Sequence, residues 1–172
     1  MFSFGKKTVI GLDIGSSQVK AVELEPHGSN FRLRGFGFAL LPPEAIVQGS
    51  FMNAPAISAA ISEACAMGGF KSKDVVTSVS GHSVIVKRIT LPAQSKEELE
   101  ESIRWEAEQY IPFDINEVNL DHQILRESGV DGQMDVLLVA AKKDLIDDYV
   151  SVITEAGLSL LVMDVDAFAV GN

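Results

Sequence analysis

The sequence predicts a mixed α/β fold of two subdomains, in which a smaller βαββα unit is inserted into a larger unit built on a mixed sheet. Residues 8–13, 18–25 and 31–40 are rich in Val, Ile, Leu and Phe and are separated by turn-forming residues, which predicts a three-stranded meander. A helical pattern and a further strand over 74–80 follow. After Gly81 the alternation of strands and helices begins again, which predicts the second subdomain.

The first part of the chain carries the signals of a strand meander followed by a helix. Residues 26–30, Pro-His-Gly-Ser-Asn, form a dense turn signal between the second and third strands. Gly35 and Gly37 interrupt the alternation of the third strand, which indicates a bulge or the close approach of another backbone. Asn53 suits a helix N-cap, and apolar residues then recur at three and four positions until a Gly-Gly pair.

The second part of the chain predicts a separate subdomain over residues 82–158. Its first strand is followed by a helix that opens with a capping box, Ser95 with Glu98. Two more strands and a second helix complete the βαββα pattern. We expect both helices to pack one face against the hairpin of these two strands. The first subdomain then comprises residues 1–81 and 159–172.

Composition limits the classes of protein to which the chain can belong. A formal charge of −10 and a pI near 4.7 argue against a general affinity for nucleic acid or anionic lipid, because both favour clustered Lys and Arg. Cys65 is the only cysteine, so no intrachain disulfide forms, which fits the cytoplasm. No run of about eighteen apolar residues is present, so we expect no direct membrane insertion.

The segment VIGLDIGSSQVKAVEL, residues 9–24, places polar residues between two expected strands. It matches neither the P-loop pattern GxxxxGK[ST] nor the dinucleotide pattern GxGxxG. A tight turn here can aim backbone N–H groups at an anion, a carboxylate can hold Mg²⁺ through water, and a lysine can supply positive charge. The candidate nucleotide contacts are Asp13, Gly15, Ser16, Ser17 and Lys20, and Asp13 is also the candidate Mg²⁺ ligand, through water. A plain Gly-Ser hairpin turn is the alternative interpretation.

The same segment resembles the first phosphate hairpin of the actin, Hsp70 and sugar-kinase superfamily. Within this superfamily, the division protein FtsA and the PilM family of type IV pilus assembly typically have a different subdomain in place of the usual one, at the position of residues 82–158. Three segments look like the PilM family: FSFGKK, RWEAEQYIPFDINEV over 104–118, and VMDVDAFAV. The chain thus resembles the N-terminal half of an actin-like PilM protein. An FtsA-like division protein, a type II secretion domain and a sugar kinase or Hsp70-type ATPase remain alternatives.

The resemblance implies that the adenosine-binding half is absent from this sequence. The last residues read as the first turn of a helix, so we expect a fragment. ATP and Mg²⁺ would bind in the cleft of the full-length protein, with slow or regulatory hydrolysis, and this fragment would be inactive. Asp164 or Asp166 would approach that cleft, or Asp166 would be a helix N-cap. The family also implies a cytoplasmic scaffold at the inner membrane that assembles in rings with other pilus platform or motor proteins.

PilM-like proteins hold a short N-terminal peptide of the membrane protein PilN between these two subdomains, so the resemblance implies PilN as a partner. An extended apolar peptide needs aliphatic and aromatic pockets. Trp105 lies opposite the apolar stripe of its helix, so it is an interface anchor or a cover for the neighbouring subdomain. Ordinary packing of the aromatic residues and solvation of the charged ones remain alternatives. The predicted groove walls are Arg88, Trp105, Glu108, Ile111, Pro112 and Phe113.

Overall fold

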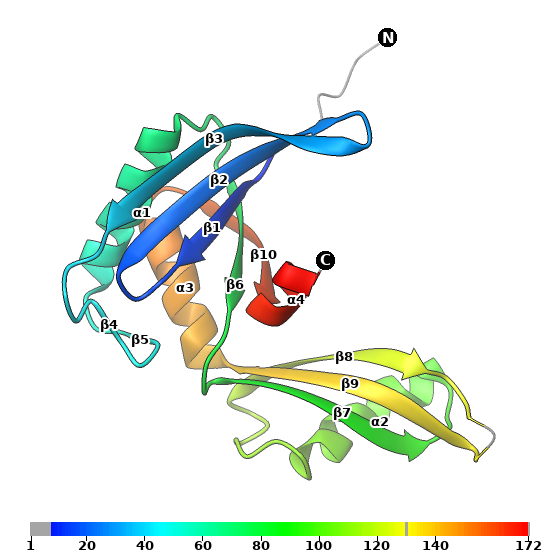
Figure 1. Cartoon of the computed structure of the whole chain (residues 1–172). Helices are drawn as coiled ribbons and strands as arrows, with labels where there is room; N and C mark the ends of the chain where they lie inside the picture. The colour runs from blue at the N-terminus through cyan, green and yellow to red at the C-terminus, as the bar shows by residue number, and fades with distance from the viewer. Residues whose placement is uncertain (1–7, 130, 172) are drawn as a thin grey trace. The chain divides into compact units, whose positions relative to one another are not determined.

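The structure is a computed structural model that describes residues 8–129 and 131–171. The chain forms two compact units: a first unit made of the chain up to Gly81 and from Asp147 onward, and a second unit, His82–Ile146 (Figure 1). The division after Gly81 coincides with the predicted one, whereas the second division falls earlier than the predicted boundary after residue 158. The FSFGKK segment lies outside the described residues.

The first unit is built on a five-stranded sheet with the strand order β10-β6-β1-β2-β3 (Figure 1). The predicted meander is antiparallel, whereas β1, β6 and β10 run parallel to one another. The strands are β1 (Ile10–Ile14), β2 (Gln18–His27), β3 (Asn30–Leu40), β6 (Asp74–Val79) and β10 (Ser159–Val165), and a small ribbon joins β4 (Ile46–Val47) to β5 (Ser50–Phe51). Parallel strands end at the same edge of a sheet, where α/β proteins commonly place ligands.

Helix α1 (Ala54–Gly68) covers one face of this sheet. Its residues Ile57 and Ile61 are fully buried together with alternate residues of β1 and β6. The Asn53 side chain accepts a hydrogen bond from the Ala56 N–H at 3.1 Å, which confirms the predicted N-cap. The other face of the sheet carries α4 (Asp166–Gly171), whose Ala169 lies beside it.

The two glycines of β3 lie where α1 crosses the strand. A side-chain carbon at Gly35 would lie 2.6 Å from the Gly68 carbonyl oxygen, and one at Gly37 would overlap the backbone of Ala64. The pairing of β2 with β3 also shifts register beside Gly35. Both predicted reasons for these glycines therefore apply, since the strand carries a bulge and another backbone approaches it closely.

Helix α3 (Lys143–Glu155) accounts for the earlier second division of the chain. The Tyr149 ring contacts the Phe51 ring with centroids 4.8 Å apart, and the Ser58 hydroxyl donates a hydrogen bond to the Glu155 carboxylate at 2.9 Å. The helix thus packs within the first unit, whereas the sequence predicts packing on the hairpin of the second. An amphipathic stripe indicates which side of a helix is buried, and it does not indicate which sheet buries it.

The second unit is a three-stranded antiparallel sheet covered on one face by α2. Its elements are β7 (Val84–Pro92), α2 (Lys96–Glu108), β8 (Val118–Arg126) and β9 (Gln133–Lys142), with β9 in the centre. Leu99, Ile103 and Ala107 of α2 are buried against alternate residues of the strands. The predicted capping box is present, and the hydrogen bond from the Ser95 N–H lowers the pKa of the Glu98 carboxyl.

Candidate functional site

The turn between β1 and β2 contains three of the five predicted nucleotide contacts. The Gly15 N–H donates to the Gln18 carbonyl oxygen at 3.0 Å, which closes the turn. The Ser17 carbonyl oxygen accepts from the Leu41 N–H at 2.9 Å, which fixes the turn to the chain after β3. The Gly15 amide is therefore used inside the turn, and in this conformation the backbone donors left for an anion belong to Ser16 and Ser17.

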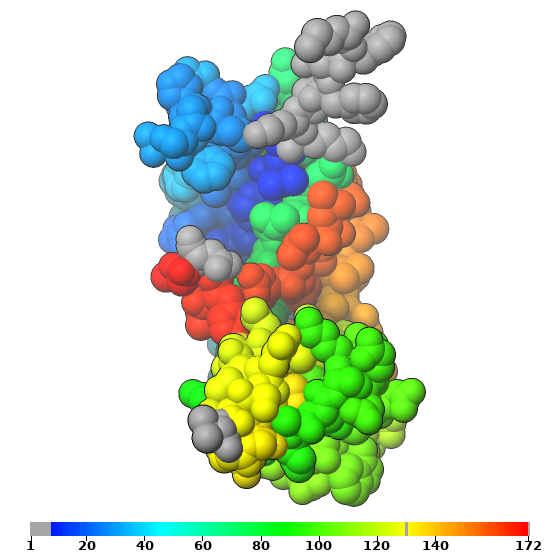
Figure 2. Space-filling model, turned by 90° about the vertical axis from the view of Figure 1, so that its right-hand side faces the viewer, coloured from blue at the N-terminus to red at the C-terminus, as the bar shows by residue number. Residues whose placement is uncertain are grey.

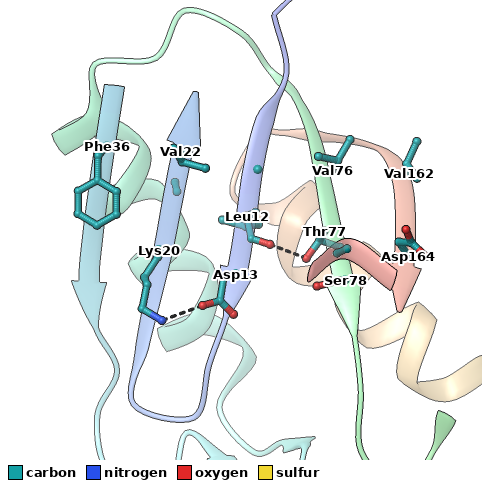
Figure 3. A pocket seen from close by; sticks show the side chains of 13 residues that line it. Leu12, Asp13, Lys20, Val22, Phe36, Val76, Thr77, Ser78, Val162 and Asp164 are labelled. Atoms are coloured by element: carbon teal, nitrogen blue, oxygen red, sulfur yellow. Dashed lines mark hydrogen bonds and ion pairs between the residues drawn. The ribbon is translucent and has the colours of Figure 1, made fainter. Parts of the chain in front are cut away.

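The other two predicted contacts, Asp13 and Lys20, face each other across β1 and β2. They form one register pair of these strands, and the Lys20 ammonium lies 2.8 Å from an Asp13 carboxylate oxygen (Figure 3). The Asp13 side chain is 63% exposed and that of Lys20 is 42% exposed, so solvent screens the pair and it contributes little to stability. The pair instead fixes the position of two charged groups, because it holds an ammonium and a carboxylate together beside the turn.

Two more polar side chains continue this row across the parallel strands. The register pair of Leu12 with Thr77 places Asp13 next to Ser78 of β6, and Ser78 is itself paired with Asp164 of β10. The Thr77 hydroxyl donates to the Leu12 carbonyl oxygen at 2.8 Å and so links β1 to β6. The structure thus assembles Lys20, Asp13, Ser78 and Asp164 from four strands, all beside the same cavity (Figure 3).

The cavity that these residues line has a volume of about 560 Å³ and lies on the face of the sheet that α1 does not cover. This volume lies within the range of small-molecule sites. Most of its wall is apolar, and the polar side chains gather toward the ends of the parallel strands. The apolar lining includes Val22, Phe36, Val76, Val162 and Ala169. The cavity could therefore hold a ligand with an apolar body and a polar, charged end.

Tyr149 of α3 is a further residue on which the charges at the polar end act, and no motif in the sequence singles it out. Burial raises the pKa of its hydroxyl to about 12, and the negative charges of Asp166 and Asp13 add to this shift. The hydroxyl therefore stays protonated at neutral pH. Of the two acidic residues expected near the cleft, Asp164 lines the cavity, whereas Asp166 begins α4.

A metal at this site would depend on few protein ligands. Within residues 8–129 and 131–171, no three His, Cys, Asp or Glu side chains are grouped closely enough to hold a metal ion. Mg²⁺ commonly binds proteins through one or two carboxylates, several waters and the phosphates of a substrate. Asp13 fits that pattern, so the donor set suits a hydrated magnesium–phosphate ligand better than a permanently bound metal.

The six predicted groove residues all belong to the second unit, where they lie in different environments. Trp105 is 65% exposed on α2, opposite the buried stripe as predicted, and Glu108 is also exposed. Ile111 is buried in the core. Pro112 is exposed, and Phe113 packs against the core with the Lys142 ammonium 4.6 Å from its ring centroid. The groove itself stays a prediction.

Arg88 lies on β7 and takes part in an ion-pair network. Its guanidinium donates to the buried Asp135 carboxylate at 2.8 Å, and the Thr90 hydroxyl donates to the same carboxylate at 2.9 Å. The Arg126 guanidinium forms an ion pair with that carboxylate at 2.9 Å. The hydrogen bonds from Arg88 and then Thr90 lower the pKa of Asp135. Arg88 is thus not a freely solvated charge, although 65% of its side chain is exposed.

Comparison with known proteins gives the family of the chain. The family profile of the type IV pilus assembly protein PilM matches residues 11–172. The chain belongs to the PilM family. A solved PilM-PilN type IV pilus biogenesis complex contains a chain that is similar at 33% identity, with a TM-score of 0.81 over 94% of this chain. This chain covers 48% of that PilM-PilN structure's chain, so it spans about half of its length.

A second solved structure shares the fold of this PilM-family chain. It is the cytoplasmic domain of EpsL, an inner membrane component of the type II secretion system of Vibrio cholerae, at 13% identity with a TM-score of 0.61 over 95% of this chain and 59% of that one. The predicted fold class, an actin-like half with an inserted subdomain, is confirmed by these matches. Within the described residues, no helix is long and apolar enough to cross a membrane.

Proposed function

We propose that this chain belongs to a cytoplasmic scaffold of the type IV pilus inner-membrane platform and binds the N-terminal cytoplasmic peptide of PilN. The observation that carries the proposal is the similarity to a chain of a PilM-PilN complex over 94% of this chain. Because the match extends over nearly all of the sequence, both units are included in it. The role of a longer protein remains part of the proposal, since this chain spans about half of that relative.

The peptide would contact the second unit around the outer surface of α2. Trp105 supports this placement, because exposed tryptophans are frequent anchors of protein interfaces. Glu101 and Glu108 lie within one helical turn of Trp105 and are exposed. Their charge would attract the positively charged N-terminus of a peptide. Ile111 would support the wall from beneath, because it is buried in the core.

Nucleotide binding is the second part of the proposal. Asp13 would hold hydrated Mg²⁺, and Ser16, Ser17 and Lys20 would contact phosphate, which the polar row and the cavity support. The negative charge of a bound phosphate would attract the Lys20 ammonium and so separate it from the Asp13 carboxylate. A full-length protein would supply the remaining wall, so this chain alone would bind ATP weakly or not at all. We expect hydrolysis, where it occurs, to be slow or regulatory.

The proposal also includes assembly and location. The protein would form rings and contact other pilus platform or motor proteins. It would stay in the cytoplasm and reach the inner membrane only through PilN. The acidic composition supports this mode of attachment, because a net charge of −10 disfavours direct binding to anionic lipid.

Calorimetric titration with a synthetic peptide copying the N-terminus of the PilN that accompanies this protein tests the proposed function. We expect saturable binding with one site per chain. A peptide of the same composition in scrambled order serves as the control and should not bind. Absence of heat with the authentic peptide, on a folded sample, would overturn the proposed function.

A further inference from the structure

Helix α3 belongs to both units of the chain. The division between the units falls between Ile146 and Asp147, inside this helix. Strand β9 ends at Lys142 and α3 begins at Lys143, so no loop separates them (Figure 1). Part of α3 (orange) is visible at the surface of the first unit in Figure 2, and its Val150 is 40% exposed. A shift of α3 would therefore leave this side of the core intact and would be passed on directly to β9.

The first turn of α3 is fixed within the second unit, beside a predicted groove residue. The Lys143 N–H donates to the Glu117 carbonyl oxygen, and the Lys143 ammonium donates to the Asn116 carbonyl oxygen, both at 2.8 Å. The preceding residue, Lys142, places its ammonium 4.6 Å from the centroid of the Phe113 ring. A shift at the start of α3 would therefore also move the segment that leads from Phe113 into β8.

The part of α3 that lies in the first unit contacts the ribbon of β4 and β5. The Phe51 ring of β5 lies against the Tyr149 ring, with centroids 4.8 Å apart. At the base of the ribbon, the Ala45 carbonyl oxygen accepts hydrogen bonds from the N–H groups of Met52 at 2.8 Å and Asn53 at 3.2 Å. The ribbon is thus attached to the start of α1 at its base and to α3 through its aromatic residue.

The same ribbon is connected to the turn between β1 and β2. The Leu41 N–H donates to the Ser17 carbonyl oxygen at 2.9 Å, and Leu41 lies shortly before β4 in the chain. Pro42 and Pro43 follow Leu41, and proline fixes φ, so this connection is stiff. Ser17 is one of the proposed phosphate contacts. A phosphate bound at the turn would therefore also hold the chain that enters the ribbon.

The ribbon is the part of this path that can change its arrangement at the lowest cost. Only two residues of β4 pair with two residues of β5, and so short a hairpin is marginally stable by itself. On either side of β4, Glu44 and Gln48 have φ angles of 63° and 50°. Residues with side chains adopt this left-handed conformation at a cost, and such strain is frequent in segments that switch. The ribbon is therefore the element that a ligand at the turn would reorder.

We propose that phosphate binding at the turn between β1 and β2 and peptide binding at the second unit are coupled through α3. The path leads from Ser17 through Leu41 and the ribbon to Tyr149, and along α3 to Lys143. The coupling rests on the proposed function and adds its regulation. A nucleotide phosphate would order the turn and the ribbon, so peptide binding would then cost less conformational entropy and become tighter. By linkage, the peptide would raise the affinity for the nucleotide by the same factor.

Calorimetric titration of the full-length protein with the PilN peptide, without nucleotide and with Mg²⁺ and a saturating non-hydrolysable ATP analogue, tests the coupling. We expect the nucleotide to lower the peptide Kd by at least about fivefold, as allosteric couplings commonly do. Phe51→Leu removes the ring contact with Tyr149, and Lys143→Met removes the side-chain hydrogen bond to Asn116. Each should reduce the coupling to less than about twofold and leave the Kd of either ligand alone within about twofold of the wild type.

Met52→Leu is the matched control, because Met52 follows Phe51 and is 67% exposed, so this variant should keep the wild-type coupling. Titrations with each ligand alone separate the possible failures. If the peptide or the nucleotide does not bind the wild type by itself, the proposed function fails and the coupling fails with it. If both bind but the nucleotide leaves the peptide affinity unchanged or weakens it, only the coupling is overturned. Coupling that persists in both Phe51→Leu and Lys143→Met would overturn the path through α3.

Discussion

Asp13 and Lys20 form a register pair of β1 and β2, with the carboxylate and the ammonium 2.8 Å apart beside an apolar cavity. Neither residue is adjacent in sequence to Ser78 or Asp164, which complete the row on β6 and β10. The pair itself is a poor source of stability because it is exposed. Its arrangement is useful for a ligand that brings both a cation and an anion, as magnesium-bound phosphate does.

Asp13→Ala tests this arrangement. In the full-length protein, we expect the substitution to abolish the Mg-ATP binding that calorimetry measures, because the hydrated cation loses its carboxylate ligand. Stability should change by less than about 1 kcal/mol, since the lost ion pair is exposed. Glu25→Ala is the control: it removes a carboxylate that is ion-paired across β2 and β3, in the neighbouring hairpin, and does not line the cavity. Retained Mg-ATP affinity in the Asp13 variant would indicate that the segment is a plain hairpin turn without a role in nucleotide binding.

Gly37→Ala tests the close approach of α1 to β3. The added carbon would overlap the Ala64 backbone, which cannot move aside as a flexible side chain can, so we expect a loss of about 1–3 kcal/mol in the free energy of unfolding. Gly11→Ala is a milder control, because its added carbon would meet a Val22 methyl group at 3.2 Å. Urea denaturation monitored by circular dichroism compares the two variants. Equal midpoints would contradict the packing described for α1.

Tyr149→Phe tests the raised pKa of the buried hydroxyl. The folded state holds this pKa at about 12 against an ordinary value of 10, so the folded state favours the protonated form. The resulting stabilisation is complete below pH 10 and is lost as the pH rises through 12. Relative to the Phe variant, the wild type should lose about 2–3 kcal/mol of unfolding free energy across this window. A constant difference between the two from pH 9 to pH 12 would contradict the assignment.

Asp135→Asn tests the ion-pair network of the second unit. Hydrogen bonds from Arg88 and Thr90 lower the pKa of Asp135 below its ordinary value of 3.8, so the ionised carboxylate stabilises the fold above that value. We expect the variant to unfold at a lower urea concentration than the wild type at pH 7. The emission of the single tryptophan, Trp105, monitors unfolding. The difference should shrink as the pH falls below 3.8. A difference that persists in acid would indicate a packing effect.

Local patterns were sufficient to predict most elements of the fold. Asn53 and the Ser95–Glu98 box begin helices as expected, because caps depend on residues three positions apart. The predicted position of Trp105 opposite the buried stripe of its helix also holds, since it follows from helical periodicity alone. The glycines of β3 indicated a bulge or a close approach, and the structure has both, although the sequence did not identify α1 as the neighbour.

Features that depend on strand order could not be predicted in the same way. The row of Asp13, Ser78 and Asp164 arises because β6 lies between β1 and β10, and no local pattern encodes that order. The assignment of α3 to the second unit differs from the structure for a related reason. Its stripe predicts a buried face, but the partners of Tyr149 and Glu155 lie about one hundred residues earlier in the chain.

Peptide binding at Trp105 is the most direct test of the proposed function. Trp105 is the single tryptophan of the chain and is largely exposed, so its emission reports on anything that covers it. Phe113→Ala should weaken the binding free energy of the peptide by about 1–3 kcal/mol, as truncation of an interface anchor does. Trp105→Ala should have the same effect when binding is measured by calorimetry. Glu97→Ala, on the first turn of α2, should have little effect.

The decisive measurement is therefore the tryptophan emission of the wild-type chain during titration with the N-terminal PilN peptide. We expect a saturable shift of the emission to shorter wavelength, because the bound peptide would exclude water from the indole ring. An emission spectrum that does not change while calorimetry records binding would place the peptide elsewhere. An unchanged spectrum together with no heat of binding would contradict the proposal that this chain receives PilN.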